Sequence, residues 1–498
     1  MSGVGAPRPS ASDWPAGAYP RADLPERVLQ FGTGILLRAL SAAAVDAANR
    51  QGRFNGRIVV VQSTPHGVAR DMNAQDGLFT LVEQGLENGA RVDRARLIGA
   101  ISRALVADTE WDAVRALVAR PELQVIVSNV TEAGFRRDAP FPARLLDLLR
   151  ARFAALRDGP PLFVIPTELV PDNGTRLAEM IQDLAGRTDR AFRSWLERGV
   201  RFCSSLVDRI TTAPSPEIRA SVEARLGYSD GLLTLTEPYS LWAIAADPAE
   251  LSAVFPIDAS PSPGVVFTPD ISFYSQRKLR LLNGAHTAMA PLAILSGVDT
   301  VREAVEHPTI GAFLQRLLFD EVVPGSGLPV EEARSFARDV VDRFRNPWLE
   351  HRWAVISTNQ TPKLRLRVLP SVLEFAVSCH RVPLCLALAC AASLRFSRCT
   401  EQVSASEGRG WWRGASYSIQ DVDLPRLNGH WWAVDPEHAA GPVPAETLQR
   451  LAVRILGDAG LWGVSFTDAP EFVAAVAAAL CRLEEVGVEG AIAALGAA

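Results

Sequence analysis

The first half of the chain alternates short, continuous apolar runs with longer stretches in which apolar residues recur at helical spacing. The apolar runs are rich in β-branched residues, as is typical of parallel strands that are buried on both faces. Strands that alternate with helices in this way predict a doubly wound α/β domain. The predicted strands are 27–32, 57–63, 124–129 and 162–166, and the predicted helices are 35–49 and the segment after Asn173 and Gly174.

After about residue 275 the pattern changes, and almost every segment has the spacing of an amphipathic or a buried helix. The second half is therefore predicted to be a mainly α-helical domain. One part of it, residues 399–438, contains two Trp-Trp pairs and several glycines, and is predicted to be a long loop. The predicted helices are 276–296, 300–318, 329–345, 363–378, 383–397, 444–457 and 469–485.

Local composition suggests where these domains begin and end. Residues 1–25 are rich in Pro, Gly, Ala and Ser and contain no apolar stretch, which predicts a disordered tail rather than a signal peptide. Residues 248–269 are rich in Pro, Ser and Asp and are predicted to connect two domains. We therefore expect an α/β domain over residues 26–270 and a helical domain over residues 271–498.

Overall composition excludes several classes of protein. The 498 residues carry a formal net charge of -5, which gives no electrostatic support for binding nucleic acid or an anionic membrane. The longest apolar run, residues 384–394, is well short of the roughly 20 residues that span a bilayer. The six cysteines form no CxxC pair, so we expect neither a disulfide scaffold nor a metal site, and a reducing cytoplasm as the location. The sequence does not indicate an oligomeric state.

A glycine-containing turn follows the first predicted strand, and the predicted helix begins directly after it at Ile35. Gly32 and Gly34 permit a tight turn and a close backbone approach, and the N-terminus of the helix would face a pyrophosphate. Leu37 stands where a third glycine is expected, so the match is partial. The pattern alone leaves a structural turn and a cofactor loop equally open.

Three further segments follow predicted strands, at the sheet edge where ligands bind in open α/β sheets. The second strand ends in Gln62 and Ser63, where neither the acid expected for NAD nor an Arg expected for NADP is present. Cofactor preference is therefore not readable there. The segments 127–134 and 167–174 follow the third and fourth strands, although polar loops that cap a following helix would give the same pattern.

Lysine is rare in this chain. Of 51 basic Lys and Arg residues, only Lys278 and Lys363 are lysines. Codon bias towards Arg accounts for the general excess. A lysine that persists under such a bias is a candidate for chemistry that Arg cannot perform, because Lys can titrate near neutrality when it is partly buried.

Lys278 lies in the segment QRKLRLLNGAHTAM with Asn283 and His286. At about 100° per residue these three side chains share one broad helical face. They offer a proton-transfer group, an amide that can polarise a carbonyl and a second hydrogen-bonding group, which reduction of a ketone requires. Arg277 and Arg280 flank the lysine and would lower its pKa. A solvated Lys, an Asn that ends a turn and a core His are the structural alternative.

Lys363 lies in a second basic cluster, TPKLRLRVLP, together with Arg365 and Arg367. Such a cluster after a turn could clamp a substrate carboxylate, for which Arg offers bidentate geometry and Lys a point charge. The alternative is a helix whose charges face solvent, and for Arg365 that alternative is the favoured one.

Together these segments resemble the long-chain polyol and uronate dehydrogenases of the mannitol dehydrogenase family, over about residues 27–490. The Lys-x4-Asn-x2-His spacing matches the catalytic signature of that family. The other matching segments are LQFGTGILLRA, NAQDGLFTL, SNVTEAGF, PTELVPDNG, LVDRI, TEPYSLW, RFRNPW and KLRLRVLPS.

The resemblance implies a Rossmann-type first domain, a mainly helical second domain, a site in the cleft between them, and no metal. It implies NAD as the cofactor, with NADP not excluded. By the same resemblance Lys278 is the general acid–base, Asn283 contributes to the oxyanion site and His286 contacts the substrate. The implied cofactor contacts are Gly32, Gly34, Ile35, Gln62, Asn129, Thr131 and Glu132, and the implied substrate contacts are Glu168, Lys363 and Arg367.

Two positions depart from the pattern of the polyol dehydrogenases. Glu168 and Leu169 stand where those enzymes have an Asp-Asn pair, whose Asn is a second oxyanion donor. This Glu-Leu form resembles the branch that reduces tagaturonate, and it argues against mannitol as the substrate. Ile35 and Leu36 replace an Asn-Phe pair in the cofactor turn of that branch.

The function expected from the resemblance is NAD(H)-dependent reduction of a small sugar acid, with tagaturonate and altronate as the interconverted pair. Reduction of fructuronate and oxidation of a polyol at carbon 2 are the enzymatic alternatives. A sugar-acid-binding protein without catalysis is an alternative of another class, suggested by the partial glycine turn and the missing ribose acid. The presence of Lys278, Asn283 and His286 argues against it.

Overall fold

The computed structural model describes residues 7–15, 18–186, 189–258, 264–437 and 441–495. The chain folds into two compact units, Met1–Tyr274 and Ser275–Ala498. Each unit is described by itself below.

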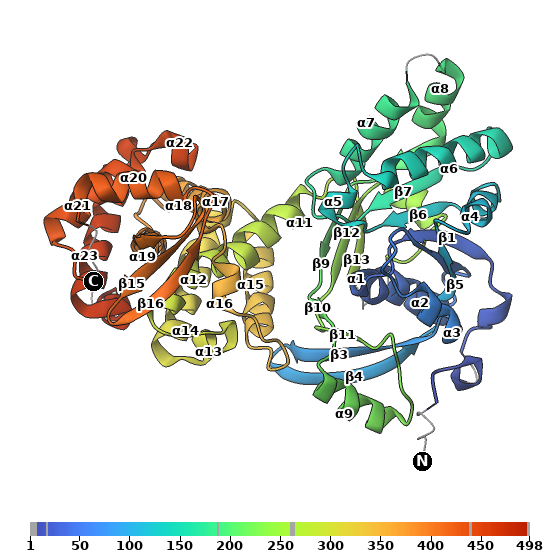
Figure 1. The fold of residues 1–498 in the computed structure, drawn as a ribbon, viewed down its shortest axis with the longest axis horizontal. Helices are drawn as coiled ribbons and strands as arrows, with labels where there is room; N and C mark the ends of the chain where they lie inside the picture. Colours follow the sequence, from blue (N-terminus) through green and yellow to red (C-terminus); the bar gives the residue numbers. More distant parts are fainter. Residues whose placement is uncertain (1–6, 16–17, 187–188, 259–263, 438–440, 496–498) are drawn as a thin grey trace. The chain divides into compact units, whose positions relative to one another are not determined.

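The first unit contains a six-stranded sheet in which every neighbouring pair of strands is parallel (Figure 1). The strand order is that of the Rossmann fold, with the direction of chain progression reversing between β1 and β6. The four predicted strands correspond to β1, β2, β6 and β7, so the predicted α/β class is confirmed. In sheet order the strands are β5 (Ile101–Val106), β2 (Arg57–Gln62), β1 (Glu26–Phe31), β6 (Val125–Ser128), β7 (Leu162–Pro166) and β8 (Val200–Phe202).

Both faces of this sheet are buried, which explains why its strands are continuously apolar. In β1, Val28 belongs to one hydrophobic cluster and Leu29 and Phe31 to the other. Helices α2 (Ala43–Arg50) and α3 (Ala69–Ala74) contribute to the first cluster. The second cluster includes side chains of α4 (Trp111–Val118), α6 (Pro140–Leu156), α7 (Asn173–Ala185) and α8 (Arg190–Gly199).

The described part of the first unit also contains two smaller sheets, which the sequence patterns do not predict. The hairpin of β3 and β4 turns at Asn88 and Gly89, both at positive φ, a turn for which an Asn-Gly pair is the strongest short-range signal. One sheet contains β3 (Phe79–Glu87), β4 (Ala90–Ile98), β10 (Thr211–Thr212) and β11 (Thr234–Thr236). The other contains β9 (Ser205–Asp208), β12 (Leu241–Ala245) and β13 (Gly264–Thr268).

The prediction of a disordered tail over residues 1–25 is wrong for residues 7–15 and 18–25. The guanidinium of Arg50 lies 4.8 Å from the centre of the Trp14 ring, and the Tyr19 hydroxyl donates to Asp46 over 2.8 Å. These aromatic side chains provide packing that the average composition of the segment conceals. The remainder of the predicted tail lies outside the described residues.

The predicted domain connection over residues 248–269 is also wrong, because its described residues belong to the first unit. Helix α10 (Pro248–Ser252) begins with a proline. A proline is tolerated there because N–H groups in the first turn have no partner within the helix. The side chain of Asp247 caps the helix. Strand β13 then pairs in parallel with β12. Residues 259–263 of this segment lie outside the described residues.

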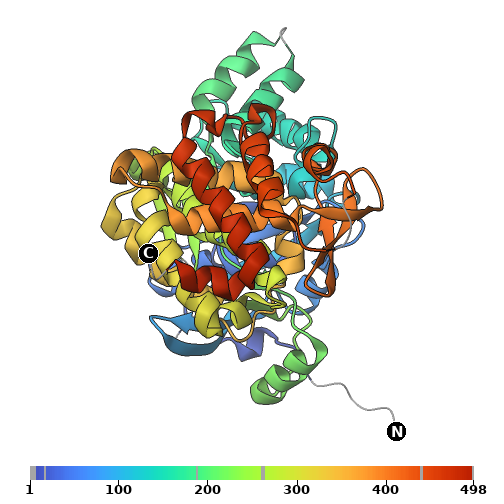
Figure 2. The same ribbon diagram turned by 90° about the vertical axis from the view of Figure 1, so that its left-hand side faces the viewer.

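The second unit is mainly helical, as predicted (Figure 2). Its long helix α23 (Pro470–Ala494) packs against α19 (Leu384–Phe396) and α21 (Ala445–Leu456), and kinks at Gly487, where φ is 77°. The other helices include α11 (Ser272–Arg277), α12 (Gly284–Leu295), α13 (Val301–Glu306), α14 (Pro308–Arg316), α15 (Val330–Phe344), α16 (Trp353–Ile356), α17 (Gln360–Arg367), α18 (Leu369–Cys379), α20 (Leu424–Val434) and α22 (Ala459–Trp462).

Residues 399–437 do not form the predicted long loop, and residue 438 of that prediction lies outside the described residues. They form an antiparallel sheet of β14 (Cys399–Gln402), β15 (Glu407–Trp412) and β16 (Ala415–Gln420), followed by α20. Gly410 has a structural role here, because a Cβ at this position would lie 2.3 Å from the Tyr417 ring. That ring stacks on Phe396 with 5.0 Å between centroids, which joins the sheet to α19.

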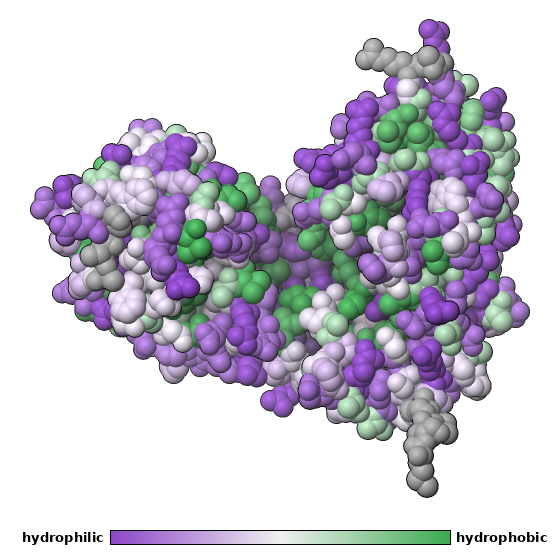
Figure 3. Space-filling model, in the orientation of Figure 1, coloured by the Kyte–Doolittle hydropathy of each residue, from purple (hydrophilic) through white to green (hydrophobic). Residues whose placement is uncertain are grey.

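The surface mixes hydrophilic and hydrophobic residues (Figure 3). No helix among the described residues has the length and apolar character to cross a bilayer. Within the same residues, no group of three or more His, Cys, Asp or Glu side chains is arranged to hold a metal ion. All six cysteines are free thiols.

Candidate functional site

In the first unit, the predicted cofactor residues lie at the carboxyl ends of β1 and β6, the point where the strand order reverses. Gly32 follows β1 with φ at +118°, a conformation that side chains rarely adopt. A Cβ at this position would lie 2.7 Å from the backbone oxygen of Asn129, which follows β6. Glycine is thus required here for two neighbouring strand ends to approach each other.

Gly34 differs from Gly32 in its surroundings. Its φ is -66°, and a Cβ added there would meet nothing within 4 Å. Gly34 precedes the first turn of helix at Ile35, and the helix continues as the π-helix Arg38–Ala42 and then as α2. The stability of the fold therefore does not require glycine at this position. Close approach of a ligand to the backbone would require it.

Arg38 anchors the turn from inside the helix. Its guanidinium donates to the Thr33 carbonyl over 2.7 Å and to the Thr234 hydroxyl over 3.0 Å. Burial lowers the pKa of Arg38 to about 10, so the side chain remains charged at neutral pH. The glycine turn is consequently held to the strand β11 as well as to β1.

The turn after β6 is tied to the turn after β7. Asn129 donates its side-chain amide to the Thr167 hydroxyl over 2.9 Å. Thr131 has φ at +67°, which is a genuine outlier for a β-branched residue and is a kind of strain that clusters at functional sites. Glu132 lies next to it and is exposed.

Glu168 is buried and holds this pair of turns together. Its carboxylate accepts the Val130 N–H over 2.9 Å and the Ser128 hydroxyl over 3.2 Å. Burial raises the pKa of Glu168, and these hydrogen bonds oppose that rise. The structure therefore gives the Glu168 carboxylate a positioning role among unit 1 residues, and its predicted contact with substrate stays a prediction.

Gln62 at the end of β2 is likewise engaged in its own loop. Its side chain donates to the Thr64 carbonyl over 3.0 Å and accepts the Ala69 N–H over 3.0 Å. Because one donor and one acceptor of the amide are already used, Gln62 organises the loop where a ribose-binding acid is expected. Its contact with a cofactor stays a prediction.

In the second unit, the three predicted catalytic residues lie along one continuous helical segment that contains a π-helix. The π-helix runs from Lys278 to Asn283, between α11 and α12. Its hydrogen bonds join residues five apart, the spacing of Lys278 and Asn283, so the two side chains project from one face. Single π-turns inside α-helices are rare and frequently occur at functional sites.

His286 follows in the first turn of α12 and is 8% exposed. Its ring stacks on Phe344 with 4.2 Å between centroids and meets His351 edge-on at 5.1 Å. Its Nε2 is buried without a hydrogen-bond partner. Burial lowers the pKa of His286 well below its ordinary value, assisted by the charges of Arg343 and Arg367, so the ring is neutral at neutral pH.

The two candidate substrate residues of the second unit lie on α17. The Lys363 ammonium donates to the Ile356 carbonyl over 2.9 Å, and Arg367 donates to the Thr287 hydroxyl over 3.4 Å. Burial lowers the pKa of both side chains, and for Lys363 the Arg367 charge adds to that effect. Both side chains retain further N–H donors.

Helix α17 lies directly against the segment that contains Lys278. Arg280 donates to the Leu366 carbonyl over 3.0 Å, and a Cβ at Gly284 would lie 3.1 Å from the Arg367 carbonyl. The glycine in the predicted catalytic motif is thus explained by close helix packing. Because of this packing, the basic residues of α17 lie close enough to His286 to lower its pKa.

Comparison with known proteins decides the family. Residues 26–252 match the family model described as the mannitol dehydrogenase Rossmann domain, and residues 270–422 match the mannitol dehydrogenase C-terminal domain. The chain belongs to the mannitol dehydrogenase family. It is accordingly an oxidoreductase.

Relatives in this family span essentially the whole chain. The altronate oxidoreductases of Escherichia coli O139:H28 (strain E24377A / ETEC) and of Escherichia coli O9:H4 (strain HS) are each 34% identical to it, over 95% of this chain and 98% of theirs. The predicted resemblance to the mannitol dehydrogenase family is confirmed by these matches.

Two solved dehydrogenase structures have the same fold. Mannitol 2-dehydrogenase from Pseudomonas fluorescens, in a ternary complex with NAD and D-mannitol, has a TM-score of 0.64 at 23% identity, over 99% of this chain and 97% of that one. Substrate-free D-sorbitol dehydrogenase has a TM-score of 0.76 at 21% identity, over 98% of each chain. At these identities the likeness concerns the fold.

The structure groups the predicted residues by unit. Gly32, Gly34 and Asn129 lie at the edge of the Rossmann sheet, whereas Lys278, Asn283, His286, Lys363 and Arg367 lie on two packed helices of the second unit. Sequence reasoning missed Arg343, Phe344 and His351, which surround His286. A signal existed, because the RFRNPW segment that contains Arg343 and Phe344 was among the matching segments.

Proposed function

We propose that this protein is a nicotinamide-dependent reductase of keto-hexuronates, which interconverts tagaturonate and altronate. The observation that carries the proposal is the placement of Lys278 and Asn283 on a single π-helical turn, one helical turn before a buried neutral His286. The relatives named altronate oxidoreductase, at 34% identity over nearly the whole chain, support this choice of substrate.

The first unit fits a dinucleotide. The Gly34 backbone is open to approach, since nothing lies within 4 Å of the place of its Cβ, and the helix that begins at Ile35 has its positive end there. Gly32 and Asn129 would flank the pyrophosphate, and Gln62 would lie on the ribose side. When bound, the nicotinamide ring supplies or takes up a hydride. We propose NAD(H) for this role.

The second unit supplies the proton and the polarising groups. Lys278 would donate a proton to the oxygen of the keto group during reduction and remove it during oxidation. Asn283 would donate its side-chain amide to the same oxygen and stabilise the negative charge that develops there. His286, neutral because it is buried, can donate or accept a hydrogen bond to a neighbouring hydroxyl through its unpartnered Nε2.

A carboxylate on the substrate would meet basic residues of the same unit. Lys363 and Arg367 share one face of α17, and together with Arg343 they exert positive charge on His286. Lys363 keeps two N–H donors beyond the one given to Ile356, and Arg367 can bind a carboxylate with paired donors. This concentration of cations favours an anionic sugar acid over an uncharged polyol.

Leu169 supports the same choice of branch. It stands where polyol dehydrogenases have a second amide donor, and its side chain is 65% exposed instead of packed in the core. We propose that Asn283 is therefore the main side-chain donor to the oxyanion in this protein.

A substrate and cofactor panel tests the proposal. Purified protein would be assayed with tagaturonate, fructuronate, fructose and altronate, each with NAD(H) and NADP(H). We expect the highest kcat/KM for tagaturonate with NADH, and oxidation of altronate in reverse. A preference for fructuronate would establish the nearest rival, and a preference for an uncharged ketose would contradict the carboxylate role of Lys363. Nucleotide binding without turnover of any of these compounds would contradict reductase activity on this panel.

A further inference from the structure

Helix α12, which contains His286, has a proline in its interior. Pro291 has no N–H, so it cannot make the hydrogen bond that residue 291 of an α-helix normally donates to the carbonyl of residue 287. The carbonyl of Thr287 therefore loses its ordinary partner within the helix. Thr287 is fully buried, and an unpaired carbonyl at such a position is destabilising.

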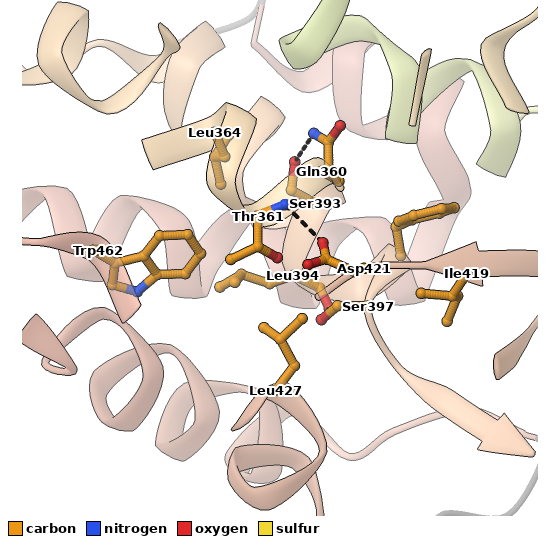
Figure 4. Close-up of a pocket in the computed structure, with 11 residues that line it drawn as sticks. Gln360, Thr361, Leu364, Ser393, Leu394, Ser397, Ile419, Asp421, Leu427 and Trp462 are labelled. Atoms are coloured by element: carbon orange, nitrogen blue, oxygen red, sulfur yellow. Dashed lines mark hydrogen bonds between the residues drawn. The ribbon is translucent and has the colours of Figure 1, made fainter. Parts of the chain in front are cut away.

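A side chain from another helix takes the place of the missing N–H. Gln360, the first residue of α17, donates its Nε2 to the Thr287 carbonyl over 2.8 Å. The same nitrogen lies 3.1 Å from the Ser393 hydroxyl on α19, a contact drawn in Figure 4. The orientation of the amide follows from this geometry, because Oε1 in that place would face the carbonyl oxygen of Thr287.

Thr287 connects this hydrogen bond to the candidate catalytic residues. Its hydroxyl donates to the Asn283 carbonyl over 2.8 Å and accepts from Arg367 over 3.4 Å. Gln360 and Arg367 are thus bonded to the two polar groups of the same residue, one from each end of α17. Any change in the Gln360 contact is transmitted to the turn of α12 that separates Asn283 from His286.

The surroundings leave Gln360 little freedom to move. The residue is 3% exposed and lies at the edge of a small cavity of about 10 Å³ (Figure 4). Next to it, the Thr361 N–H donates to Asp421 over 2.8 Å, which fixes the start of α17. A cavity of this size has room for at most about one water molecule, so the Gln360 side chain is closely surrounded.

We propose that Gln360 is a positioning residue for the reaction: by replacing the hydrogen bond that Pro291 removes, it sets the position of Asn283 and His286 against Lys363. The inference rests on the proposed function of those three residues. It assigns no contact between Gln360 and substrate. Gln360 acts through the Thr287 carbonyl, and Pro291 is the reason that this carbonyl is available.

The proposal predicts a specific coupling between Gln360 and Pro291. Gln360→Met keeps the volume of the side chain but removes the donor, and Pro291→Ala restores an N–H for Thr287. We expect Gln360→Met to lower kcat roughly tenfold, as expected for a buried carbonyl left unpaired, with little change in KM for the nucleotide. In the Pro291→Ala background the same substitution should lower kcat by less than about twofold, since the helix then supplies its own donor.

Ser393→Ala is the matched control, because it removes the other partner of the Gln360 amide and leaves the Thr287 contact intact. We expect its kcat to stay within about twofold of the wild type. Thermal unfolding midpoints of all variants would be measured alongside. If Gln360→Met lowers the midpoint but leaves kcat and the KM for the keto-hexuronate unchanged, the role is only structural and the proposal is wrong.

Other outcomes separate this proposal from the proposed function. If Gln360→Met lowered kcat equally in the wild type and in the Pro291→Ala variant, Gln360 would not be replacing the hydrogen bond that Pro291 removes. Should Gln360→Met not fold, Gln360→Leu tests the same point, since it also removes the donor to the Thr287 carbonyl without adding a charge, and rescue by Pro291→Ala is again expected. A wild type inactive on the whole panel would contradict the proposed function and this role with it, whereas an active wild type insensitive to Gln360→Met contradicts the positioning role alone.

Discussion

Lys278 and Asn283 are the first and last residues of one π-helical turn, so five residues of sequence bring an ammonium and an amide to the same helical face. In a regular α-helix the same spacing would separate the two side chains by about 140° around the axis. The π-turn removes most of this separation because its hydrogen bonds join residues five apart. The keto oxygen proposed as substrate could therefore meet both groups from one side.

The two glycines of the cofactor turn should respond differently to alanine. Gly32→Ala places a Cβ 2.7 Å from the Asn129 carbonyl at a φ of +118°, and should destabilise the fold by about 1–3 kcal/mol. Gly34→Ala meets no neighbour and should leave the unfolding midpoint nearly unchanged, but weaken NADH binding. Thermal unfolding and NADH fluorescence titration measure the two effects. Equal NADH affinity of Gly34→Ala and wild type would contradict a cofactor loop at this turn.

Glu168→Gln tests whether this residue acts on the cofactor side or on substrate. The carboxylate accepts the Val130 N–H and the Ser128 hydroxyl, and Gln can keep only part of this pattern. We expect KM for NADH to rise several-fold while KM for the keto-hexuronate changes little. Steady-state kinetics with each substrate varied in turn would show this. The opposite pattern, with only the sugar-acid KM raised, would favour the direct substrate contact predicted from the sequence.

Lys363→Met should weaken catalysis on charged substrates selectively. Removing a charged hydrogen-bond partner of a carboxylate should lower kcat/KM for tagaturonate by about 10- to 100-fold, with a smaller effect for fructose, which has no carboxylate. Arg365→Met is the matched control, because Arg365 lies on the same helix but donates to the Leu461 carbonyl. If Lys363→Met lowered kcat/KM equally for tagaturonate and fructose, the lysine would not bind the substrate carboxylate.

His286 should make folding stability depend on pH on the acid side of neutrality. Its pKa in the folded protein is depressed by burial, so between the two pKa values the unfolded chain binds the extra proton. The contribution of neutral His286 to the free energy of unfolding should therefore be complete above about pH 6.5 and should decrease as the pH is lowered. Denaturant titrations of wild type and His286→Gln at several pH values would measure this. A His286→Gln variant with the same acid-side loss as the wild type would exclude His286 as its source.

Some parts of the fold were readable from the sequence because one local signal dominated. The central strands of the Rossmann sheet are continuous β-branched runs, and these were located within a residue or two. The glycines of the Trp-rich segment predict a loop, whereas in the structure Gly410 makes room for Tyr417 in a sheet. In the tail, Trp14 and Tyr19 provide packing that the surrounding Pro and Gly obscured.

The candidate site could be predicted from the sequence to a similar extent. The types and spacing of Lys278, Asn283 and His286 were visible, but the π-turn was not, because helical periodicity assumes a constant rotation per residue. The aromatic cage of His286 comes from Phe344 and His351, which are distant in sequence. The contact of Gln360 with Thr287 joins residues 73 apart in sequence, and no local pattern marks it.

The central claim is that Lys278 moves the proton of the keto group, and exchange of each lysine for Arg tests it most directly. Arg keeps the charge but does not titrate near neutral pH, so Lys278→Arg should lower kcat for tagaturonate reduction by about 10²- to 10⁴-fold with unchanged NADH affinity. Lys363→Arg should lose far less, because binding a carboxylate requires only the charge. Near wild-type turnover by Lys278→Arg at neutral pH would contradict the account.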